Sequence, residues 1–467
     1  MGSEWLALLL SFIVPVLVRW VPESKFPYPI GFDTPLYLSW GRHYTSNPVV
    51  FPLMVPLLGG LYLLGFDLVT VMKYLPTLVY GLLGVSVFLF SRLCLNWRLE
   101  KSLLVVFLIA FSFPMLRVSW DMHKQFIATA FLVLAFSWLK TIETPLGFVA
   151  FAVSSFLAAF SHDVLFAVLM VVCSYVFLVE VRRNRKRAIL ISVVTLSILL
   201  IFIGVWYGWN FGLIVKNGVG GIVLDTSSLF DRWTWEVNKN LFEFFQICGL
   251  FVPLVVLGFF KDEVLFPWLI LGLLGSFSTI LFPFRAPSIN PSRWMLLLAC
   301  PFSFYMANGL DRLTLITRKS LKKMVALFFV VFIINFPSWG FLGFFPQPSL
   351  YYKPGLLPLT MASSSAPLDD IDATIWLVRR FNDVGGEALL VHGNYFGWAS
   401  YYTDKIVVTF GELYGGDRSI KDALKIAQNS GNIDVYLLWY VDGDAFSLSF
   451  IKVAERGPMK LYRYVGS

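Results

Sequence analysis

The chain has 467 residues, of which 57% are hydrophobic, 17% are aromatic and only 14% are charged. Soluble globular proteins carry about 25% charged residues, so this composition excludes a soluble protein and predicts a polytopic α-helical membrane protein. The net charge of +8 fits Lys and Arg in cytoplasmic loops, and it is weak evidence for nucleic acid, which we do not expect as a partner.

Apolar runs along the chain predict about eleven transmembrane helices. Their approximate ranges are 4–20, 71–92, 102–119, 125–141, 145–160, 164–181, 188–207, 243–260, 264–282, 294–310 and 324–343. Cysteines are confined to apolar stretches, and we interpret them as small buried hydrophobic residues rather than as disulfide or metal ligands. They are Cys94, Cys173, Cys248 and Cys300.

Basic loops predict the orientation of these helices, because Lys and Arg collect on the cytoplasmic side. The strongest cluster is 182–187, a second follows at 312–323, and Arg92, Arg98 and Lys101 form a third. With these inside, the N-terminus is predicted to be cytoplasmic and the C-terminal segment extracytoplasmic.

Residues 49–66 are apolar enough to be an additional span, which would move the N-terminus or the basic turn after Arg92 to the other side. Pro52, Pro56 and the Gly59-Gly60 pair interrupt the run. We therefore interpret it as a helix at the outer interface, within an outer loop that covers 21–70. The alternative is an ordinary short transmembrane helix.

Two further segments are predicted outside. Residues 208–242 are rich in Gly and Trp, and 346–467 form the only large soluble piece, so we divide the chain into 1–345 and 346–467. The second part contains no Walker motif, nucleotide-binding glycine pattern or metal-ligand spacing. It reads as a small α/β domain with helices at 369–382 and 419–428 and strands at 388–391, 406–410, 435–439 and 461–464.

Ionisable residues gather at the predicted outer ends of the spans. Because such groups are costly at membrane depth, they are candidates for function. They are Asp33, Arg42, His43, Asp121, His123, Lys124, His162, Asp163, Arg285 and Arg293. A cleft that combines carboxylates and cations at one bilayer face suits phosphate-ester chemistry on a lipid.

Asp33 is the first candidate for a catalytic base, because a desolvated carboxylate has a raised pKa. The alternative is a turn or helix-cap aspartate before Thr34-Pro35, and Asp121 has the same alternative at the start of the helix through Phe126.

The remaining candidates also have structural alternatives. His162 and Asp163 lie in a short connection and can form a simple turn, whereas Arg285 and Arg293 can be interface anchors. A mixture of oxygen and imidazole ligands would suit a divalent cation such as Mn²⁺ or Mg²⁺. The residues that offer it are Asp33, Asp121, His123, His162 and Asp163.

The layout of the chain resembles the GT-C superfamily of membrane glycosyltransferases, particularly lipid A aminoarabinose transferases and protein O-mannosyltransferases. One helix is followed by an outer loop with an acid and an aromatic residue, here Asp33 and Tyr37. A Pro-containing interfacial segment, 52–66, a helix with Leu75-Pro76 and a basic turn at Arg92 come next.

Later parts of the chain extend this resemblance. Asp121 matches a second outer-loop acid, and Arg293-Trp294 before Pro301 is similar to a late basic loop of the family. The sequence departs from the family where Thr34 follows Asp33, since the first acidic motif is often paired. It has no Trp-Trp-Asp motif in the soluble part, so it does not resemble an oligosaccharyltransferase.

The resemblance implies an inverting transfer of a sugar from a polyprenyl (dolichyl-type) phosphate to an acceptor hydroxyl on a lipid, glycan or protein. Asp33 and Asp121 would be catalytic. The donor phosphate would be held by Arg293, Arg285 and Lys124. Acceptor or sugar contacts, or a metal, would fall to His123, His162, Asp163 and Tyr37.

Two other classes of function remain open at this point. A transporter or flippase for a lipid-linked or polar solute would use intramembrane charges as a pathway, although it typically has mid-span charges and repeats that this chain lacks. A membrane scaffold with an outer binding domain would tolerate replacement of Asp33 and Asp121.

Overall fold

In the computed structural model, residues 2–24, 27–31, 33–46, 52–217, 251–278, 291–316, 368–410, 433–440 and 449–465 are described, with short pieces between 237 and 248 and at 425–429. Side chains of 206–217 are not included. The predicted span 324–343, most of the loop 208–242 and Arg285 lie outside these residues.

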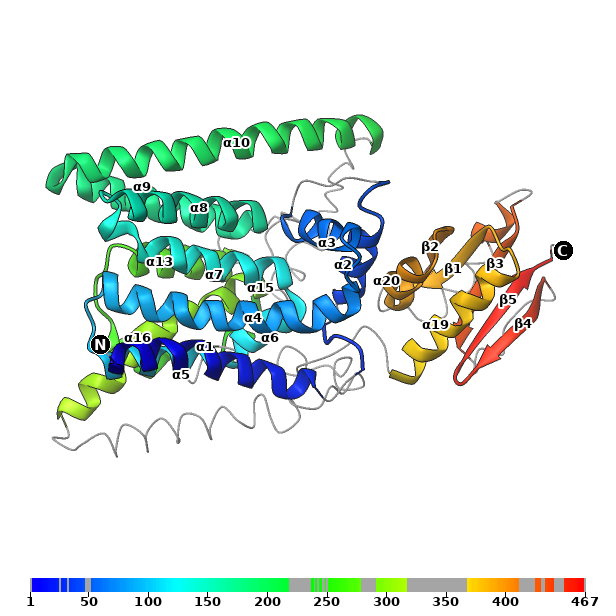
Figure 1. Cartoon of the computed structure of the whole chain (residues 1–467), viewed down its shortest axis with the longest axis horizontal. Coiled ribbons are helices and arrows are strands. Elements are labelled where there is room, and N and C mark those ends of the chain that lie inside the picture. The colour runs from blue at the N-terminus through cyan, green and yellow to red at the C-terminus, as the bar shows by residue number, and fades with distance from the viewer. Residues whose placement is uncertain are drawn as a thin grey trace.

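Helices that run alongside one another form most of the molecule (Figure 1). The helices of the bundle are α1 (Gly2–Glu23), α4 (Leu68–Leu89), α5 (Leu99–Ala110), α6 (Phe113–Asp121), α7 (His123–Ser137), α8 (Pro145–Ser161), α9 (Asp163–Arg183), α10 (Arg185–Asn217), α12 (Val252–Gly258), α13 (Leu265–Ser276), α15 (Pro291–Leu297) and α16 (Ala299–Ile316). Short π and 3₁₀ turns follow α4 and α7 at Phe90–Cys94 and Leu139–Thr141.

Within the described residues, four helices are long and apolar enough to cross a membrane, and a bent pair raises the number to five. Many outward-facing side chains on these helices are apolar; Leu200 on α10, for example, is 70% exposed. An apolar surface of this kind is stable only against lipid. The mostly helical, membrane-type architecture is therefore as predicted, and the number of eleven spans stays a prediction.

Two predicted spans are broken. The run 102–119 divides into α5 and α6, which meet at an angle of 56°, because Pro114 in the first turn of α6 cannot continue the preceding helix. The run 294–310 divides at Leu298 into α15 and α16.

Two short helices lie at the end of the bundle that faces the C-terminal sheet (Figure 1). They are α2 (Thr34–Arg42) and α3 (Met54–Leu63). The α3 helix has 10 residues and is about 15 Å long, half of the ~30 Å hydrocarbon core. It is thus too short to cross alone, as the interfacial interpretation of 49–66 requires.

The C-terminal sheet has five strands in the order β2-β1-β3-β5-β4. The strands β1 (Ala388–His392), β2 (Ile406–Phe410) and β3 (Val435–Tyr440) are parallel, and β5 (Met459–Tyr464) and β4 (Phe450–Arg456) are antiparallel to their neighbours. Helices α19 (Leu368–Asp383) and α20 (Gly393–Tyr402) pack with it. The four predicted strands and the helix 369–382 are confirmed, whereas β4 and α20 were not predicted. Of the helix predicted at 419–428, the structure describes only 425–428, which are helical.

Paired charges occupy the end of the bundle that carries the N-terminus, opposite the sheet (Figure 1). Glu4 contacts Arg92 at 2.6 Å, and Asp311 contacts Lys101 at 3.1 Å. Of the basic residues that were predicted to be cytoplasmic, Arg92 and Lys101 therefore meet acids at this end. Most of the cluster 312–323 lies outside the described residues, and the orientation in the membrane stays a prediction.

Candidate functional site

Three segments that are far apart in sequence meet at the opposite end of the bundle. They are the turn before α2, the junction of α6 and α7, and the start of α15. Asp33 is close enough to residues of the other two segments for their charges to act on it. These charges belong to Asp121, Arg293, Lys124 and Arg117. Both acids and two of the three cations predicted from the sequence thus belong to one cluster.

Asp33 is the N-cap residue of α2, as the structural alternative expected, but its side chain makes no capping hydrogen bond. The carboxylate is therefore not used to cap the helix and can interact with a substrate. Burial, followed by the charge of Asp121, raises the pKa of Asp33 to about 6, while Arg293, Lys124 and Arg117 oppose the rise. A carboxylate with this pKa is a stronger base than an ordinary aspartate and is still mostly ionised at pH 7.

Asp121 is the last residue of α6 and does not start the next helix, whose N-cap is Met122. The structural alternative, in which Asp121 caps that helix, is therefore wrong, because the chain turns at Met122 between two helices. Arg117 lies one turn earlier on α6 and contacts the Asp121 carboxylate at 2.6 Å, and both side chains are buried. Sequence reasoning missed Arg117, although its i,i+4 spacing to Asp121 was a usable signal.

Gly31 brings the two carboxylate-bearing segments together. A Cβ at this position would lie 2.0 Å from the backbone oxygen of Trp120, the residue before Asp121. The φ angle of Gly31 is +132°, in a region that favours glycine. Only glycine therefore allows the turn before Asp33 to rest directly on the end of α6.

Two cations lie side by side in the cluster. Lys124, in the first turn of α7, is largely buried and feels the charge of Arg293. Arg293 lies on α15, which is joined to α7 by a hydrogen bond of 3.3 Å from Gln125 Nε2 to the Arg293 carbonyl oxygen. Neighbouring like charges repel, so an anion between them would be stabilised.

His123 and Tyr37 lie beneath these charges. The Nε2 atom of His123 is 2.8 Å from the hydroxyl of Thr34, and its ring meets that of Tyr37 at a centroid distance of 5.8 Å. Both residues are almost fully buried. They fix the first turn of α2 to the first turn of α7, and Thr34 is a further residue that sequence reasoning did not select.

His162 and Asp163 form the connection between α8 and α9. His162 accepts a hydrogen bond from the Val164 amide and caps α9, as the turn alternative expected. Asp163 lies 3.0 Å from the His162 ring and is half exposed. The charge of Asp163 also acts on Lys124, so this pair borders the cluster.

The residues predicted as metal ligands are poorly suited to a metal. Asp121 pairs with Arg117, His123 contacts Thr34, and His162 caps its helix. Among the described residues, no group of three His, Cys, Asp or Glu side chains converges as a metal site requires. We therefore derive no catalytic step through a metal.

The C-terminal sheet region contacts the helix that Asp33 caps. A Cβ on Gly397 of α20 would lie 2.6 Å from the carbonyl carbon of Pro35, so α20 rests on α2 at close range. Arg42, at the end of α2, donates to the Tyr401 carbonyl oxygen and contacts Asp404 at 2.9 Å. The sheet region is thereby attached to α2, the helix that follows Asp33.

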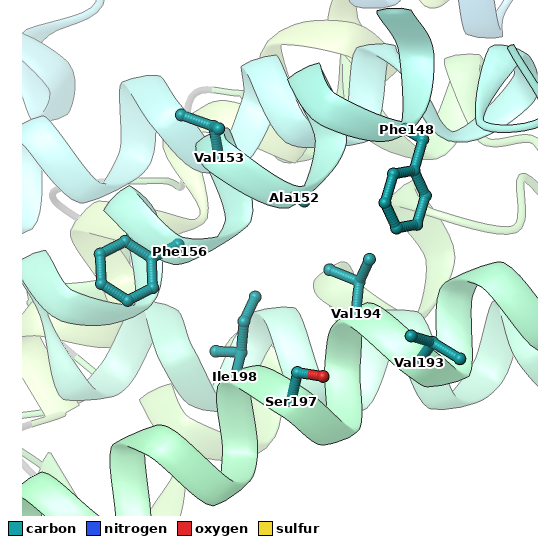
Figure 2. Close-up of a pocket in the computed structure, with 8 residues that line it drawn as sticks. All are labelled: Phe148, Ala152, Val153, Phe156, Val193, Val194, Ser197 and Ile198. Carbon is teal, nitrogen blue, oxygen red and sulfur yellow. The ribbon is translucent and has the colours of Figure 1, made fainter. Parts of the chain in front are cut away.

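An apolar groove of about 360 Å³ runs between α8 and α10 (Figure 2). Its walls come from both helices, and Ser197 supplies the one hydroxyl among them. They are Phe148, Ala152, Val153, Phe156, Val193, Val194, Ser197 and Ile198. The groove begins about two turns of α8 below His162 and suits a hydrocarbon chain.

Solved structures include proteins whose folds are similar to that of this chain. ArnT from Cupriavidus metallidurans bound to undecaprenyl phosphate superposes with a TM-score of 0.58 and 12% identity, over 100% of this chain and 99% of that one. This chain has the GT-C fold. An Archaeoglobus fulgidus oligosaccharyltransferase also superposes, over 93% of this chain. Its complex with Zn and sulfate gives a TM-score of 0.51, 15% identity and 68% coverage of that chain. The form tethered to an acceptor peptide with an NVT sequon gives 0.53, 13% and 69%. No family model and no curated protein sequence matches this chain.

Proposed function

We propose that this GT-C protein is a glycosyltransferase that moves a sugar from a polyprenyl (dolichyl-type) phosphate to an acceptor hydroxyl at the outer membrane face. The observation that carries the proposal is the partly buried cluster in which the charges of Lys124 and Arg293 act on Asp33, whose pKa is near 6. A base and an anion site are the two elements that this reaction needs.

The acceptor oxygen attacks the anomeric carbon of the sugar, and its proton passes to the Asp33 carboxylate. The bond between that carbon and the phosphate oxygen breaks, and the oxygen keeps the electron pair. Attack opposite the leaving group inverts the anomeric centre. The base contributes about 10²- to 10⁴-fold to the rate of such a step.

The leaving phosphate monoester gains negative charge and is stabilised by cations rather than by an acid. Lys124 and Arg293 supply this charge, and Arg285 is assigned to the same role from its sequence position. The planar guanidinium of Arg293 suits a bidentate contact with phosphate oxygens. These contacts strengthen as the bond breaks, so they stabilise the transition state more than the donor.

The remaining residues of the cluster orient the substrates. Asp121, held by Arg117, positions the acceptor or stabilises positive charge at the sugar ring. His123 and Tyr37 fix the floor beneath Asp33, and Asp163 beside His162 lines the acceptor side. The apolar groove between α8 and α10 (Figure 2) accepts the polyprenyl chain.

The test is sugar transfer by purified full-length protein in liposomes, with a panel of polyprenyl-phosphate sugars and a lipid extract as acceptor. Asp33→Asn is compared with Asp67→Asn. Asp67 is a matched control because it is also a helix N-cap aspartate, but its side chain caps α4 through the amides of Val69 and Thr70. We expect a rate loss of about 10³-fold for Asp33→Asn and less than about two-fold for Asp67→Asn.

Equal donor consumption by the parent and Asp33→Asn would remove Asp33 from the chemistry and keep the enzyme class. No consumption by the parent across the panel would contradict the proposed transfer. Movement of an intact lipid-linked sugar across the liposome membrane would then support the transporter class.

A further inference from the structure

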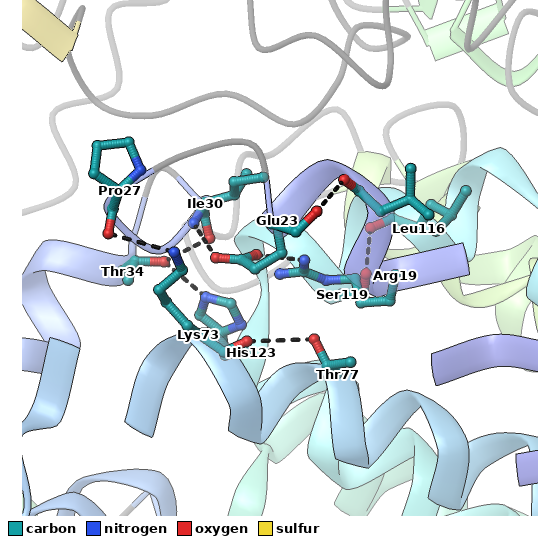
Figure 3. A network of polar contacts seen from close by, with 12 residues as sticks. Arg19, Glu23, Pro27, Ile30, Thr34, Lys73, Thr77, Leu116, Ser119 and His123 are labelled. Carbon is teal, nitrogen blue, oxygen red and sulfur yellow. Dashed lines mark hydrogen bonds and ion pairs between the residues drawn. The ribbon is translucent and has the colours of Figure 1, made fainter. Parts of the chain in front are cut away.

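The turn that carries Asp33 is held from below by polar groups of membrane helices (Figure 3). Ile30 lies outside any helix or strand, so its position depends on these contacts. On one side, the Ile30 amide donates to Glu23 Oε1 at 2.9 Å. On the other, the Thr34 hydroxyl donates to the Ile30 carbonyl oxygen at 3.0 Å and lies beside His123.

Glu23 is itself held by Arg19, one turn earlier on α1. Arg19 Nη1 donates to Glu23 Oε2 at 2.5 Å, and both side chains are completely buried. Glu23 thus uses one carboxylate oxygen for Arg19 and the other for the Ile30 amide. The Arg19 guanidinium also lies 6.0 Å from the centre of the Trp120 ring, next to Asp121.

A buried ion pair contributes little net stability, because the cost of desolvating both charges offsets their attraction. Apolar replacements are often as stable. A charged acceptor, however, makes a stronger and more directional hydrogen bond to a backbone amide than a neutral one. The pair is therefore better explained by what it holds, which is the amide three residues before Asp33.

We infer that Glu23, oriented by Arg19, is a positioning residue that anchors the turn bearing Asp33 to the first membrane helix. The anchor sets the height of the carboxylate above Lys124 and Arg293, so it acts on the reaction through Asp33 and does not touch substrate. This inference rests on the function proposed above for its catalytic part.

The test compares two double variants of the full-length protein, Arg19→Met/Glu23→Gln and Arg19→Met/Glu23→Leu. Both remove the two charges together, so neither leaves a buried charge unpaired. They differ in one respect, since Gln retains a carbonyl oxygen for the Ile30 amide and Leu does not. A melting curve in detergent confirms that each variant is folded.

Hydrogen exchange of the peptide that contains Ile30 reports the anchor directly, whatever the activity. We expect exchange about ten-fold faster in the Leu variant than in the Gln variant, because one amide hydrogen bond is lost. We also expect kcat to fall about 10²-fold in the Leu variant with the donor KM unchanged, and the Gln variant to recover most of it.

Equal exchange in the two folded variants would overturn the anchor. Faster exchange with an unchanged kcat would show that the anchor exists but does not position the base, which also overturns the inference. A parent protein that transfers no sugar would contradict the proposed function instead, and exchange would still decide whether Glu23 holds the turn.

Discussion

Charged side chains are arranged differently at the two ends of the helix bundle. At the end that carries the N-terminus, a cation such as Arg92 meets an acid, Glu4, on the partly exposed surface. At the opposite end, Asp33 is partly buried with a raised pKa, and the like charge of Arg293 acts on Lys124. Paired surface charges contribute little and need no ligand. A carboxylate with a raised pKa and two neighbouring cations cost stability unless a ligand binds there, which is typical of a functional site.

Apart from Asp33→Asn, the largest effect on transfer is expected from Gly31→Ala. The new Cβ would meet the Trp120 carbonyl oxygen and would also be strained at the φ of Gly31. Because the turn would have to move away from α6, we expect transfer to fall about 10²-fold, as for a catalytic group displaced by about 1 Å. Gly60→Ala is the control, since a Cβ there meets nothing within 4 Å. Equal activity of the two variants would contradict the close contact.

The next effect concerns stability. The pKa of Asp33 is near 6 in the folded protein, above its value of about 4 in an unfolded chain. The folded state therefore binds this proton more tightly, and the stability that it contributes is present below about pH 4 and is lost as the pH rises through 6. Asp33→Asn removes this loss, so we expect the variant to be about 2 kcal/mol more stable at pH 7.5 than the parent. Melting curves in detergent between pH 5 and 8 measure it. A variant less stable than the parent at pH 7.5 would show that the carboxylate is a structural group.

A smaller effect is expected at the cations. Lys124→Ala or Arg293→Ala removes one contact to the donor phosphate, and the affinity for a polyprenyl phosphate should fall about ten-fold. Arg92→Ala, at the paired end, is the matched control and should bind as the parent does. Titration of protein in detergent with the lipid phosphate measures both. Normal binding by Lys124→Ala and Arg293→Ala would remove the cations from the phosphate site.

The smallest effect is expected from Glu4→Gln at the paired end. The variant breaks a partly exposed ion pair with Arg92, and such pairs contribute about 0–1 kcal/mol. We expect a small shift of the melting temperature and no change in transfer. A loss of transfer would show that the two ends of the bundle are coupled.

The C-terminal sheet region shows which strands and helices can be predicted from local sequence patterns and which cannot. Strands β1 and β3 are buried apolar runs and were predicted within a residue or two. β4 was missed because its sequence, FIKVAER, is charged and mostly exposed at the edge of the sheet. α20 was missed because GNYFGWASYY is rich in glycine and aromatic residues, which are weak helix formers. Its helical form is stabilised by packing against α2.

The site shows the same division. Asp33, Asp121, Lys124 and Arg293 were selected because charged residues at the ends of apolar runs are rare and costly. Arg117 was passed over because it lies inside the predicted span 102–119, and Glu23 because it lies in the predicted outer loop 21–70 beyond the end of the first span. Their significance comes from partners that a single sequence does not display.

The sequence by itself determined that the chain is built from membrane helices with polar groups at one set of ends, because hydropathy and helical periodicity are local properties. Only the tertiary structure decided which polar groups meet. Thr34 reaches His123 across 89 positions of sequence, and Gly31 rests on the backbone oxygen of Trp120. Such contacts depend on the packing of distant segments, and that packing, rather than any local pattern, turns scattered charges into a cluster.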